Sequence, residues 1–478
     1  MNCLIDPLLE IDEYNRILKS IRNYTEPITV SGPSESQKAH LCVSVLSHLG
    51  QKGLFIAYND IQARKMYEDL AFFLGDQVLL FPSKEIMLHD VEAKSYDAVF
   101  QRLLVLDRIV DGKFTAVVTS AEALIQKLVP ESIFKRSLLS FKVGETIDLE
   151  KTAKDLVSIG FERVREVEGQ GQFSIRGGII DIYTINYDNA IRMELFDDEI
   201  DSIRSFDVLS QRSIDKVDQV KIIPVRELIY PVEGKQRVIG NLKNDLSEFL
   251  KKVTGKNSSE YISQIETNIK NDMDRIKNEH HFPGMDRFIP YIIEQPDTII
   301  DYIPGGIVFA DEPSRIRQRT ENSLLESGEA CKGMLEKGRI LPKCFELNFD
   351  YEAIQEKLDQ SISVWLNTMP VDIGMKGNRK HISIAAKTMN SYQGHIDLLI
   401  EDLKEYRQKD SKLIVLAGTR GRGERLAETL RSKGIEAYYA ESCDTEILPG
   451  QIIVTHGSLN KGFEYPAIRL VVVSDKEI

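Results

Sequence analysis

Short apolar runs alternate with helical patterns through the first part of the chain, and this alternation limits the folds that it can adopt. Strands are predicted at 27–30, 54–58, 78–81 and 115–119. Helices are predicted between them, for example at 60–74 and 95–111. Parallel strands need a long crossover, which is usually a helix, so strict alternation is typical of a parallel, doubly wound sheet. We therefore expect the chain to begin with an α/β domain.

The alternation stops near residue 131 and returns with the apolar run at 305–310. Between them, glycine-rich alternating runs at 172–183 and 191–197 predict antiparallel strands of a small α+β domain. The first domain is therefore predicted to be discontinuous. The predicted organisation has three domains. A doubly wound domain consists of two halves, 1–130 and 214–340, and an inserted α+β domain covers 131–213. A small α/β third domain covers 356–478.

The third domain is predicted from a second series of strand and helix patterns. Strands are expected near 382–386, 412–417 and 451–455, with a helix at 422–433. The chain stops directly after another apolar run at 471–473, which has the composition of a buried strand. We therefore expect the sequence to be part of a longer protein.

Composition narrows the class of protein and of partner. The chain has 478 residues, enough for three or four domains, and lacks the run of about 18 apolar residues that a membrane span requires. Its five cysteines form no C-x-x-C pair, which argues against a zinc site or disulfides and favours a reducing cytoplasm. A net charge of −13 disfavours contact with DNA, so we expect this chain to bind protein.

A damaged phosphate-binding loop follows the first predicted strand. The segment beginning at Gly32 has the position and spacing of a G-x-x-x-x-G-K-[ST] loop, and it keeps the lysine as Lys38. Gln37 replaces the glycine that lets backbone amides close around phosphates, and Ala39 replaces the hydroxyl that binds Mg²⁺. In isolation the pattern is an ordinary strand–loop–helix turn. We expect a non-functional loop, with no nucleotide or other cofactor bound to this chain.

An acidic pair ends the strand predicted at 305–310. Asp311 and Glu312 resemble the carboxylates that hold Mg²⁺ in nucleotide motors, although two solvated acids at a strand end would look the same. Without the missing hydroxyl and a nucleotide, the pair would lack partners for a metal ion. We therefore expect neither a metal site nor a catalytic residue in this chain.

The inserted domain carries the most specific pattern. The runs at 160–163, 171–183 and 192–200 resemble the second domain shared by the repair subunit UvrB and the transcription-repair coupling factors. The motif F-D-x-x-S-Q-R at 206–212 and the region 81–102 resemble the coupling factors in particular. The resemblance implies a UvrB-like module that recruits UvrA to lesions where RNA polymerase has stalled. It also implies that RNA polymerase, double-stranded DNA, ATP and Mg²⁺ are bound by later domains of a full-length protein, an ATP-driven DNA translocase.

Two departures from UvrB favour a coupling factor. UvrB keeps an intact phosphate loop, and it has a long aromatic-rich hairpin after the third strand. Here 81–82 leads into a polar stretch predicted to be helical, with Tyr96 the only tyrosine nearby. An active UvrB-like DNA-repair ATPase is the alternative. A further alternative is an intramolecular role, in which later domains mask the UvrA-binding face.

The resemblance also implies a set of contact residues. Four positions match the UvrA-binding face of this domain family: Arg163, Arg176, Tyr183 and Glu194. Arginine offers a planar fork for carboxylates, and aromatic side chains anchor protein interfaces. Ser174 stands where UvrB has another arginine, so one contact is expected to be lost or replaced. The alternative is that these residues are ordinary cross-strand pairs on a solvated sheet face.

Overall fold

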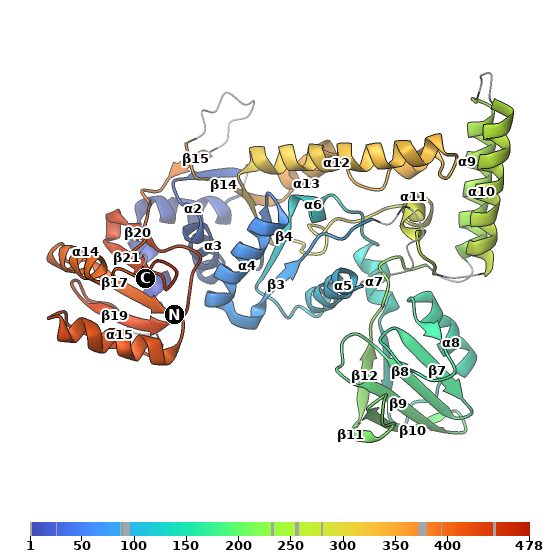
Figure 1. Ribbon diagram of the computed structural model, residues 1–478, viewed down its shortest axis with the longest axis horizontal. Helices are drawn as coiled ribbons and strands as arrows, with labels where there is room; N and C mark the ends of the chain where they lie inside the picture. The colour runs from blue at the N-terminus through green and yellow to red at the C-terminus, as the bar shows by residue number, and fades with distance from the viewer. Residues whose placement is uncertain are drawn as a thin grey trace.

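The computed structural model describes most of the chain. It covers residues 2–24, 26–86, 88, 96–230, 234–253, 258–278, 281–370, 380–392, 394–442 and 446–478. Figure 1 shows an inserted β-rich unit and a last α/β unit at opposite ends of the molecule, with a parallel sheet between them. The α/β class predicted from the sequence is confirmed.

The central sheet has seven strands in the order β15-β1-β14-β13-β2-β4-β3, and every neighbouring pair is parallel. Its strands are β1 (Ile28–Ser31), β2 (Gly53–Ala57), β3 (Val78–Phe81), β4 (Ala116–Ser120), β13 (Ile307–Asp311), β14 (Ile362–Asn367) and β15 (Lys380–Ser383). Strands β1 and β13 come from segments separated by the insertion and join one sheet. The central sheet is thus built from segments on both sides of the insertion.

Helices follow the strands of this sheet in the expected alternation. They are α1 (Asn2–Ile5), α2 (Asp12–Arg22), α3 (Ser36–Leu49), α4 (Asp60–Leu74), α5 (Asp97–Val110), α6 (Ala121–Leu124), α7 (Glu131–Ser137), α12 (Pro313–Glu336) and α13 (Tyr351–Gln360). Helix α4 begins where the Asn59 side chain accepts a hydrogen bond from the Gln62 backbone amide. Its buried face carries Ala63, Met66 and Leu70 at helical spacing.

The inserted unit is a six-stranded sheet in the order β11-β10-β9-β8-β7-β6. Its strands are β6 (Glu162–Arg163), β7 (Gln172–Arg176), β8 (Ile179–Tyr183), β9 (Ala190–Phe196), β10 (Glu199–Phe206) and β11 (Ser213–Val217), and helix α8 (Leu149–Ser158) packs beside β6. The pairs from β7 to β11 are antiparallel, as predicted, whereas the short β6 runs parallel to β7.

The insertion extends beyond residue 213, where the sequence placed its end. Strand β11 adds a further edge, and β12 (Gln219–Ile222) then pairs with β5 (Leu139–Lys142) to close the unit. The residues of β11 are almost all exposed, so this edge strand lacks the alternation of apolar and polar residues by which strands are identified in a sequence.

The last unit is a six-stranded mixed sheet in the order β16-β20-β21-β17-β19-β18. Its elements are β16 (Lys387–Thr388), α14 (Ile396–Gln408), β17 (Lys412–Ala417), α15 (Arg420–Ser432), β18 (Ala437–Tyr439), β19 (Ile452–His456), β20 (Phe463–Tyr465) and β21 (Leu470–Val473). The predicted strands at 412–417 and 451–455 and the predicted helix at 422–433 are confirmed within about two residues.

One assignment to this last unit is wrong. Residues 362–367 and 380–383 lie in the range predicted for the third domain, yet they form β14 and β15 of the central sheet, on either side of β1. Strand β14 is largely buried and lies between β1 and β13. Both strands mix apolar with polar residues, and the sequence pattern does not say which of two sheets such a short strand joins.

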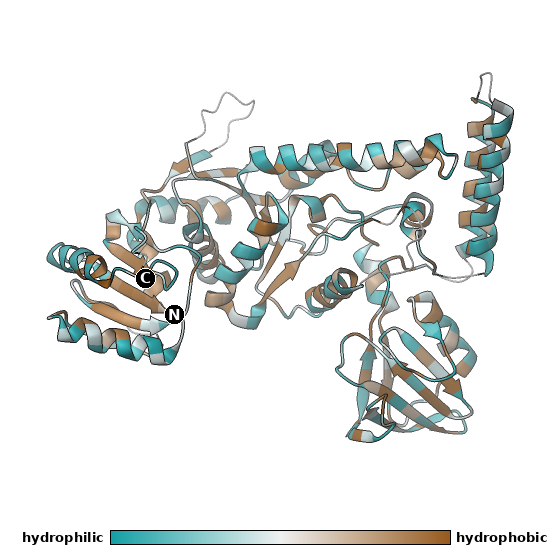
Figure 2. Ribbon diagram, in the orientation of Figure 1, coloured by the Kyte–Doolittle hydropathy of each residue, from teal (hydrophilic) through white to brown (hydrophobic). Residues whose placement is uncertain are grey.

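The two faces of the last sheet are covered by different parts of the molecule. Leu413 and Val415 of β17 pack in a core with the apolar residues of α14 and α15. Ile414 and Leu416, which alternate with them, pack in a second core that includes residues of β1, α3 and β2. The central sheet and the last unit therefore share apolar packing, and in Figure 2 their strands are mostly brown.

Beside the inserted unit, α9 (Lys235–Leu250) and α10 (Ser258–Asn278) form a helical pair at one end of the molecule (Figure 1), with α11 (Ile289–Ile292) near them. Among the described residues, no helix is both long and apolar enough to cross a bilayer. The polar stretch after β3 was predicted to be helical, but residues 82–86 and 88 are not in a helix; residues 87 and 89–95 lie outside the described residues.

Candidate functional site

A short loop connects β1 to α3, and Lys38 in the first turn of this helix forms ion pairs within the protein. Lys38 Nζ lies 2.5 Å from Asp311 Oδ1 and 2.7 Å from Glu312 Oε1. Lys38 and Asp311 are both buried, and the Glu312 carboxylate also accepts hydrogen bonds from the backbone amide and hydroxyl of Thr368. The sequence therefore pointed to two groups, the lysine and the acidic pair, that the fold brings together.

Burial raises the pKa of both carboxyl groups, and the neighbouring Lys38 lowers it. Burial raises the pKa of Asp311, although the charge of Lys38 opposes this shift. Burial would also raise the pKa of Glu312, but hydrogen bonds from Lys38 and Thr368 hold it below its ordinary value. The lysine ammonium is thus neutralised by protein carboxylates where a working loop would offer it to a phosphate.

Other residues in and after the loop contact the last unit and the segment that leads to it from β15. A Cβ added at Gly32 would lie 1.9 Å from the carbonyl oxygen of Ile384, in the segment after β15. Gln37 is buried and its Nε2 donates to the carbonyl of Glu464 in β20, 3.1 Å away. Ala39 is fully buried and has no group for a metal ion. Within the ranges that the structure describes, no group of three or more His, Cys, Asp or Glu could hold a metal.

A polar face on the inserted sheet contains two of the residues predicted to bind a partner. The register aligns Arg176 with Ile179 and Ile179 with Glu194, so their side chains leave one face of the sheet side by side. A second row on this face joins Ser174, Asp181 and Arg192 across the same strands. The opposite face carries the buried Ile180 and Met193 and packs on the core, so the polar rows face outward.

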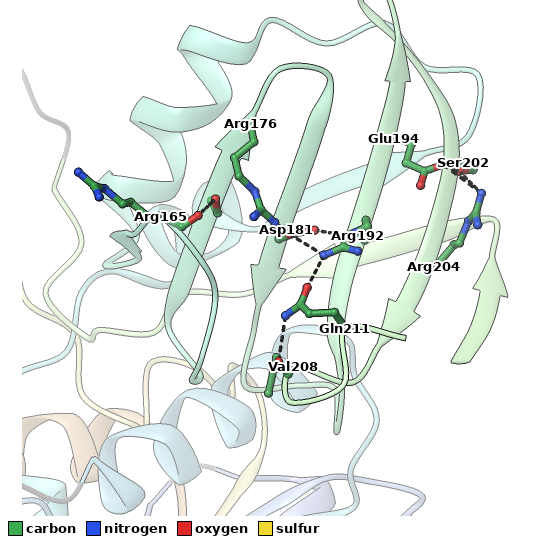
Figure 3. Close-up of polar contacts among 10 residues, drawn as sticks. Arg165, Arg176, Asp181, Arg192, Glu194, Ser202, Arg204, Val208 and Gln211 are labelled. Atoms are coloured by element: carbon green, nitrogen blue, oxygen red, sulfur yellow. Dashed lines mark hydrogen bonds and ion pairs between the residues drawn. The ribbon is translucent and has the colours of Figure 1, made fainter. Parts of the chain in front are cut away.

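The centre of this face is a buried carboxylate. Asp181 is 1% exposed and lies on β8 between two arginines, as Figure 3 shows. Arg192 donates from Nε to Asp181 Oδ1 at 2.6 Å and from Nη2 to Oδ2 at 2.9 Å. Arg176 donates from Nη2 to the same Oδ2, also at 2.9 Å. A buried carboxylate is stable when it is paired in this way.

The F-D-x-x-S-Q-R segment holds Arg192 from the other side. The Arg192 guanidinium lies 4.3 Å from the ring centroid of Phe206, a stacking contact. Arg192 Nη2 also donates to Gln211 Oε1 at 2.8 Å, and Gln211 Nε2 donates to the carbonyl of Val208. Asp207 tightens the turn by accepting from the amide and hydroxyl of Ser210. The motif thus fixes a turn beneath the polar face.

Glu194 forms a separate pair at the neighbouring strand. Its Oε2 accepts from Ser202 Oγ and from Arg204 Nη2, each at 3.0 Å (Figure 3). The side chains of Glu194 and Arg204 are 36% and 31% exposed, so this pair reaches solvent. Arg176 and Glu194, both predicted from the sequence, therefore flank Ile179 on one accessible surface.

The other two predicted contact residues are placed differently. Arg163 is exposed on the edge strand β6, but its register partner is Phe173, which belongs to the buried face of the sheet. Its side chain therefore leaves the sheet on the side opposite Arg176. Tyr183 lies on the same face as Arg176, where it packs against a small cluster with Phe206, and its hydroxyl donates to the Asp188 carbonyl at 3.0 Å.

Sequence reasoning missed the residues that organise this face: Asp181, Arg192, Arg204 and Gln211. A signal for the first was present, because Asp181 is a carboxylate between the apolar Ile180 and Ile182. Buried charges of this kind are rare without a partner. Its partner Arg192 is 11 residues away, and only the strand register brings the two together.

Comparison with known proteins places this face in a recognised domain. The family described as UvrB interaction domain matches residues 139–228, from β5 through β12. The whole chain is similar to proteins named transcription-repair-coupling factor. It is 30% identical over 479 residues to that of Bacillus subtilis (strain 168), covering 98% of this chain and 40% of the relative.

Relatives from other bacteria agree. The transcription-repair-coupling factor of Staphylococcus aureus (strain MRSA252) is 27% identical over 487 residues, which cover 99% of this chain and 40% of that protein. The Staphylococcus epidermidis protein is 28% identical over 95% of this chain and 38% of its own length. The chain therefore spans about two fifths of these relatives. The resemblance found in the inserted unit is confirmed: along nearly its whole length this chain matches bacterial transcription-repair-coupling factors, and it contains a UvrB interaction domain.

Proposed function

We propose that this chain is the UvrA-recruiting part of a transcription-repair coupling factor and that its own phosphate loop no longer binds ATP. One observation carries the first half: a UvrB interaction domain presents Arg176, Ile179 and Glu194 on one outward face. Such a row offers a cation, an apolar side chain and an anion to a protein partner. Its exposed arginine is a residue type often found at the energetic centres of interfaces.

The second half is supported by the condition of the loop. A phosphate would have to displace Asp311 and Glu312 from Lys38, although both carboxylates are already in direct contact with it. It would also meet the Gly32 turn where Ile384 packs against it. Phosphate loops bind through backbone amides and a Mg²⁺-binding hydroxyl, and Gln37 and Ala39 supply neither the open turn nor the hydroxyl.

The remaining activities are assigned to the rest of a full-length protein. This chain corresponds to about 40% of the coupling factors that it matches. We place ATP-driven translocation on double-stranded DNA, Mg²⁺-ATP binding and the contact with RNA polymerase outside the present residues. In this scheme the protein acts in the cytoplasm, and this chain contributes recruitment and regulation without catalysis.

Binding to purified UvrA tests the recruitment role. Calorimetric titration of the chain and of its Arg176→Ala variant is expected to show an affinity about tenfold lower for the variant, because an exposed interface arginine is lost. The matched control is Arg425→Ala, an exposed arginine on α15 of the last unit, which should bind UvrA like the wild type. Equal affinities for the wild type and Arg176→Ala would remove Arg176 from the interface, and no binding by the wild type would refute the recruitment role.

Nucleotide titration separates this proposal from an active UvrB-like ATPase. Adding ATP with Mg²⁺ to the chain is expected to release no heat of binding. A micromolar affinity that disappears in Lys38→Ala would show a working loop and would favour the ATPase.

A further inference from the structure

The two arginines that bind Asp181, Arg192 and Arg176, differ in how far their side chains are exposed to solvent. Arg192 is 16% exposed at its side chain, and it is bonded to Asp181 and Gln211 and stacked on Phe206. Arg176 has 49% of its side chain exposed and touches the same Asp181 through Nη2 alone. Arg192 is therefore fixed within the unit, whereas about half of the Arg176 side chain is exposed, and Figure 3 shows that side chain running toward Asp181.

The hydrogen-bonded cluster has a surplus positive charge, and its location is defined. Asp181 carries one negative charge against two positive charges on Arg176 and Arg192, while Glu194 and Arg204 neutralise each other. Because Arg192 is enclosed, the surplus is presented by Arg176. A guanidinium held at one nitrogen by a buried carboxylate has its remaining donors oriented, which suits bidentate binding of a second carboxylate.

We propose that Asp181 is a positioning residue that holds the Arg176 guanidinium in place to receive a carboxylate side chain of the partner. This inference rests on the proposed recruitment function and adds the chemistry of the contact. Asp181 itself is too buried to touch a partner, since both of its oxygens are occupied by the two arginines. Its effect on binding must pass through Arg176.

The neighbouring strands define the rest of the complementary surface. Ile179, 37% exposed, lies beside Arg176, and Glu194 lies beside Ile179 on the next strand. Adjacent strands are separated by about 4.8 Å, so Arg176 and Glu194 are about 10 Å apart across the sheet. The partner surface is therefore expected to place an Asp or Glu opposite Arg176, an apolar side chain opposite Ile179, and a neutral polar group about 10 Å from the acid, opposite the Glu194–Arg204 pair.

Asp181→Asn tests the proposal against Asp215→Asn, which makes the same chemical change at an exposed position on β11 of the same sheet. UvrA affinity is expected to fall about tenfold in Asp181→Asn and to stay unchanged in Asp215→Asn. In an Arg176→Ala background, Asp181→Asn should lower the affinity by less than about twofold, because the two residues act as one unit.

Arg176→Lys provides a second test in case Asp181→Asn does not fold. It keeps the positive charge at position 176 and leaves Asp181 paired with Arg192. It should also lower UvrA affinity about tenfold, since an ammonium cannot bridge two carboxylates with a planar fork. Wild-type affinity in Arg176→Lys, or an undiminished effect of Asp181→Asn without Arg176, would overturn the positioning role while the recruitment function stands.

A second readout does not depend on UvrA. The Nε–H signals of Arg176 and Arg192 in ¹⁵N NMR spectra of the free chain report how firmly each guanidinium is held. Asp181→Asn should speed solvent exchange at Arg176, and Asp215→Asn should not. Unchanged solvent exchange at Arg176 in Asp181→Asn would refute the positioning role, whether or not the wild type binds UvrA. Failure of the wild type to bind UvrA would refute the recruitment function instead.

Discussion

At the scale of single residues, Lys38 is held by two protein carboxylates. It is buried between Asp311 and Glu312, at 2.5 and 2.7 Å. Removing one partner of a buried ion pair leaves an uncompensated charge, which typically costs about 3–5 kcal/mol. We therefore predict that Lys38→Met lowers the free energy of unfolding by about this amount at neutral pH, as measured by urea denaturation.

The double variant Lys38→Met/Asp311→Asn supplies the control, because it also removes the more deeply buried carboxylate. It should be more stable than Lys38→Met alone, and the single variant should approach the wild type as acid protonates Asp311, whose pKa burial already raises. Equal stability of Lys38→Met and the wild type at neutral pH would contradict the structural role of the lysine.

Glu227 supports a second prediction, on the dependence of stability on pH. It is buried, and Arg102 and Lys84 pair with it where the inserted unit rejoins the central domain. Burial alone would raise the pKa of Glu227, but Arg102 and Lys84 lower it from 4.5 to about 2. Because the folded pKa is depressed, the contribution to stability is present above pH 4.5 and is lost as the pH falls toward 2.

Glu227→Gln should accordingly lower the free energy of unfolding by about 3 kcal/mol at pH 7, and the difference from the wild type should shrink between pH 4.5 and 2. Urea denaturation across this range measures it. Glu294→Gln, at a well-exposed ion pair with Arg237, should show little effect at any pH. A constant difference for Glu227→Gln across the acid range would refute the assigned pairing.

At the scale of elements, the turn between β1 and α3 depends on the absence of a side chain. Gly32 has a φ of 108° and faces the Ile384 carbonyl at a distance that no Cβ could occupy. Gly50, at the end of α3, also has a positive φ, but nothing lies within 4 Å of its Cβ position. Gly50→Ala should cost about 1 kcal/mol from backbone strain alone, whereas Gly32→Ala should cost at least about 2 kcal/mol more.

Thermal or urea unfolding of the two variants compares a crowded position with an open one, because both glycines have a positive φ but only Gly32 has an atom in the way of a Cβ. If Gly32→Ala and Gly50→Ala were equally stable, the segment at 384 could not be packed against the loop as described. A much larger effect at Gly32 would support the packing of the chain that follows β15 against the loop between β1 and α3.

Local patterns predicted elements well where the periodicity was strong. Helix α4 and strands β3 and β17 begin and end at the predicted residues, because each combines a clear apolar run with turn residues at its ends. The strand predicted near 382–386 is β15 and belongs to the central sheet instead of the third domain, and β11 was missed because its residues are almost all exposed. Partner choice between sheets is a long-range property, and edge strands have little burial to mark them.

In the candidate site, too, some residues could be identified from local sequence, whereas the roles of others depend on the fold. Arg176 and Glu194 could be predicted from a resemblance that is local in sequence. The roles of Asp181 and Gln211 depend on register and on the fold of the 206–212 turn, so no pattern within one strand could reveal them. Arg163 was grouped with Arg176, although pairing with Phe173 places it on the opposite face.

At the scale of the whole molecule, the central sheet and the last unit are joined by a common core. Phe463 and Tyr465 of β20 pack in the same cluster as Leu41 of α3 and Phe55 of β2. The face of the last sheet that α14 and α15 leave uncovered is therefore buried by the first domain. Since the parallel strands from β21 to β18 need cover on both faces, we expect the last unit to depend on the first domain for its stability.

Phe463→Ala should therefore weaken both units together. Phe463 is 1% exposed, and truncating a buried phenylalanine typically costs about 3–5 kcal/mol. Hydrogen exchange followed by mass spectrometry is expected to show faster exchange in β2 and α3 as well as in β17 and β19. Leu430→Ala is the matched control, because Leu430 is fully buried in the core between the last sheet and its own helices. The faster exchange in Leu430→Ala should be confined mainly to the last unit. If the faster exchange in Phe463→Ala were also confined to the last unit, the shared core would not couple the two units.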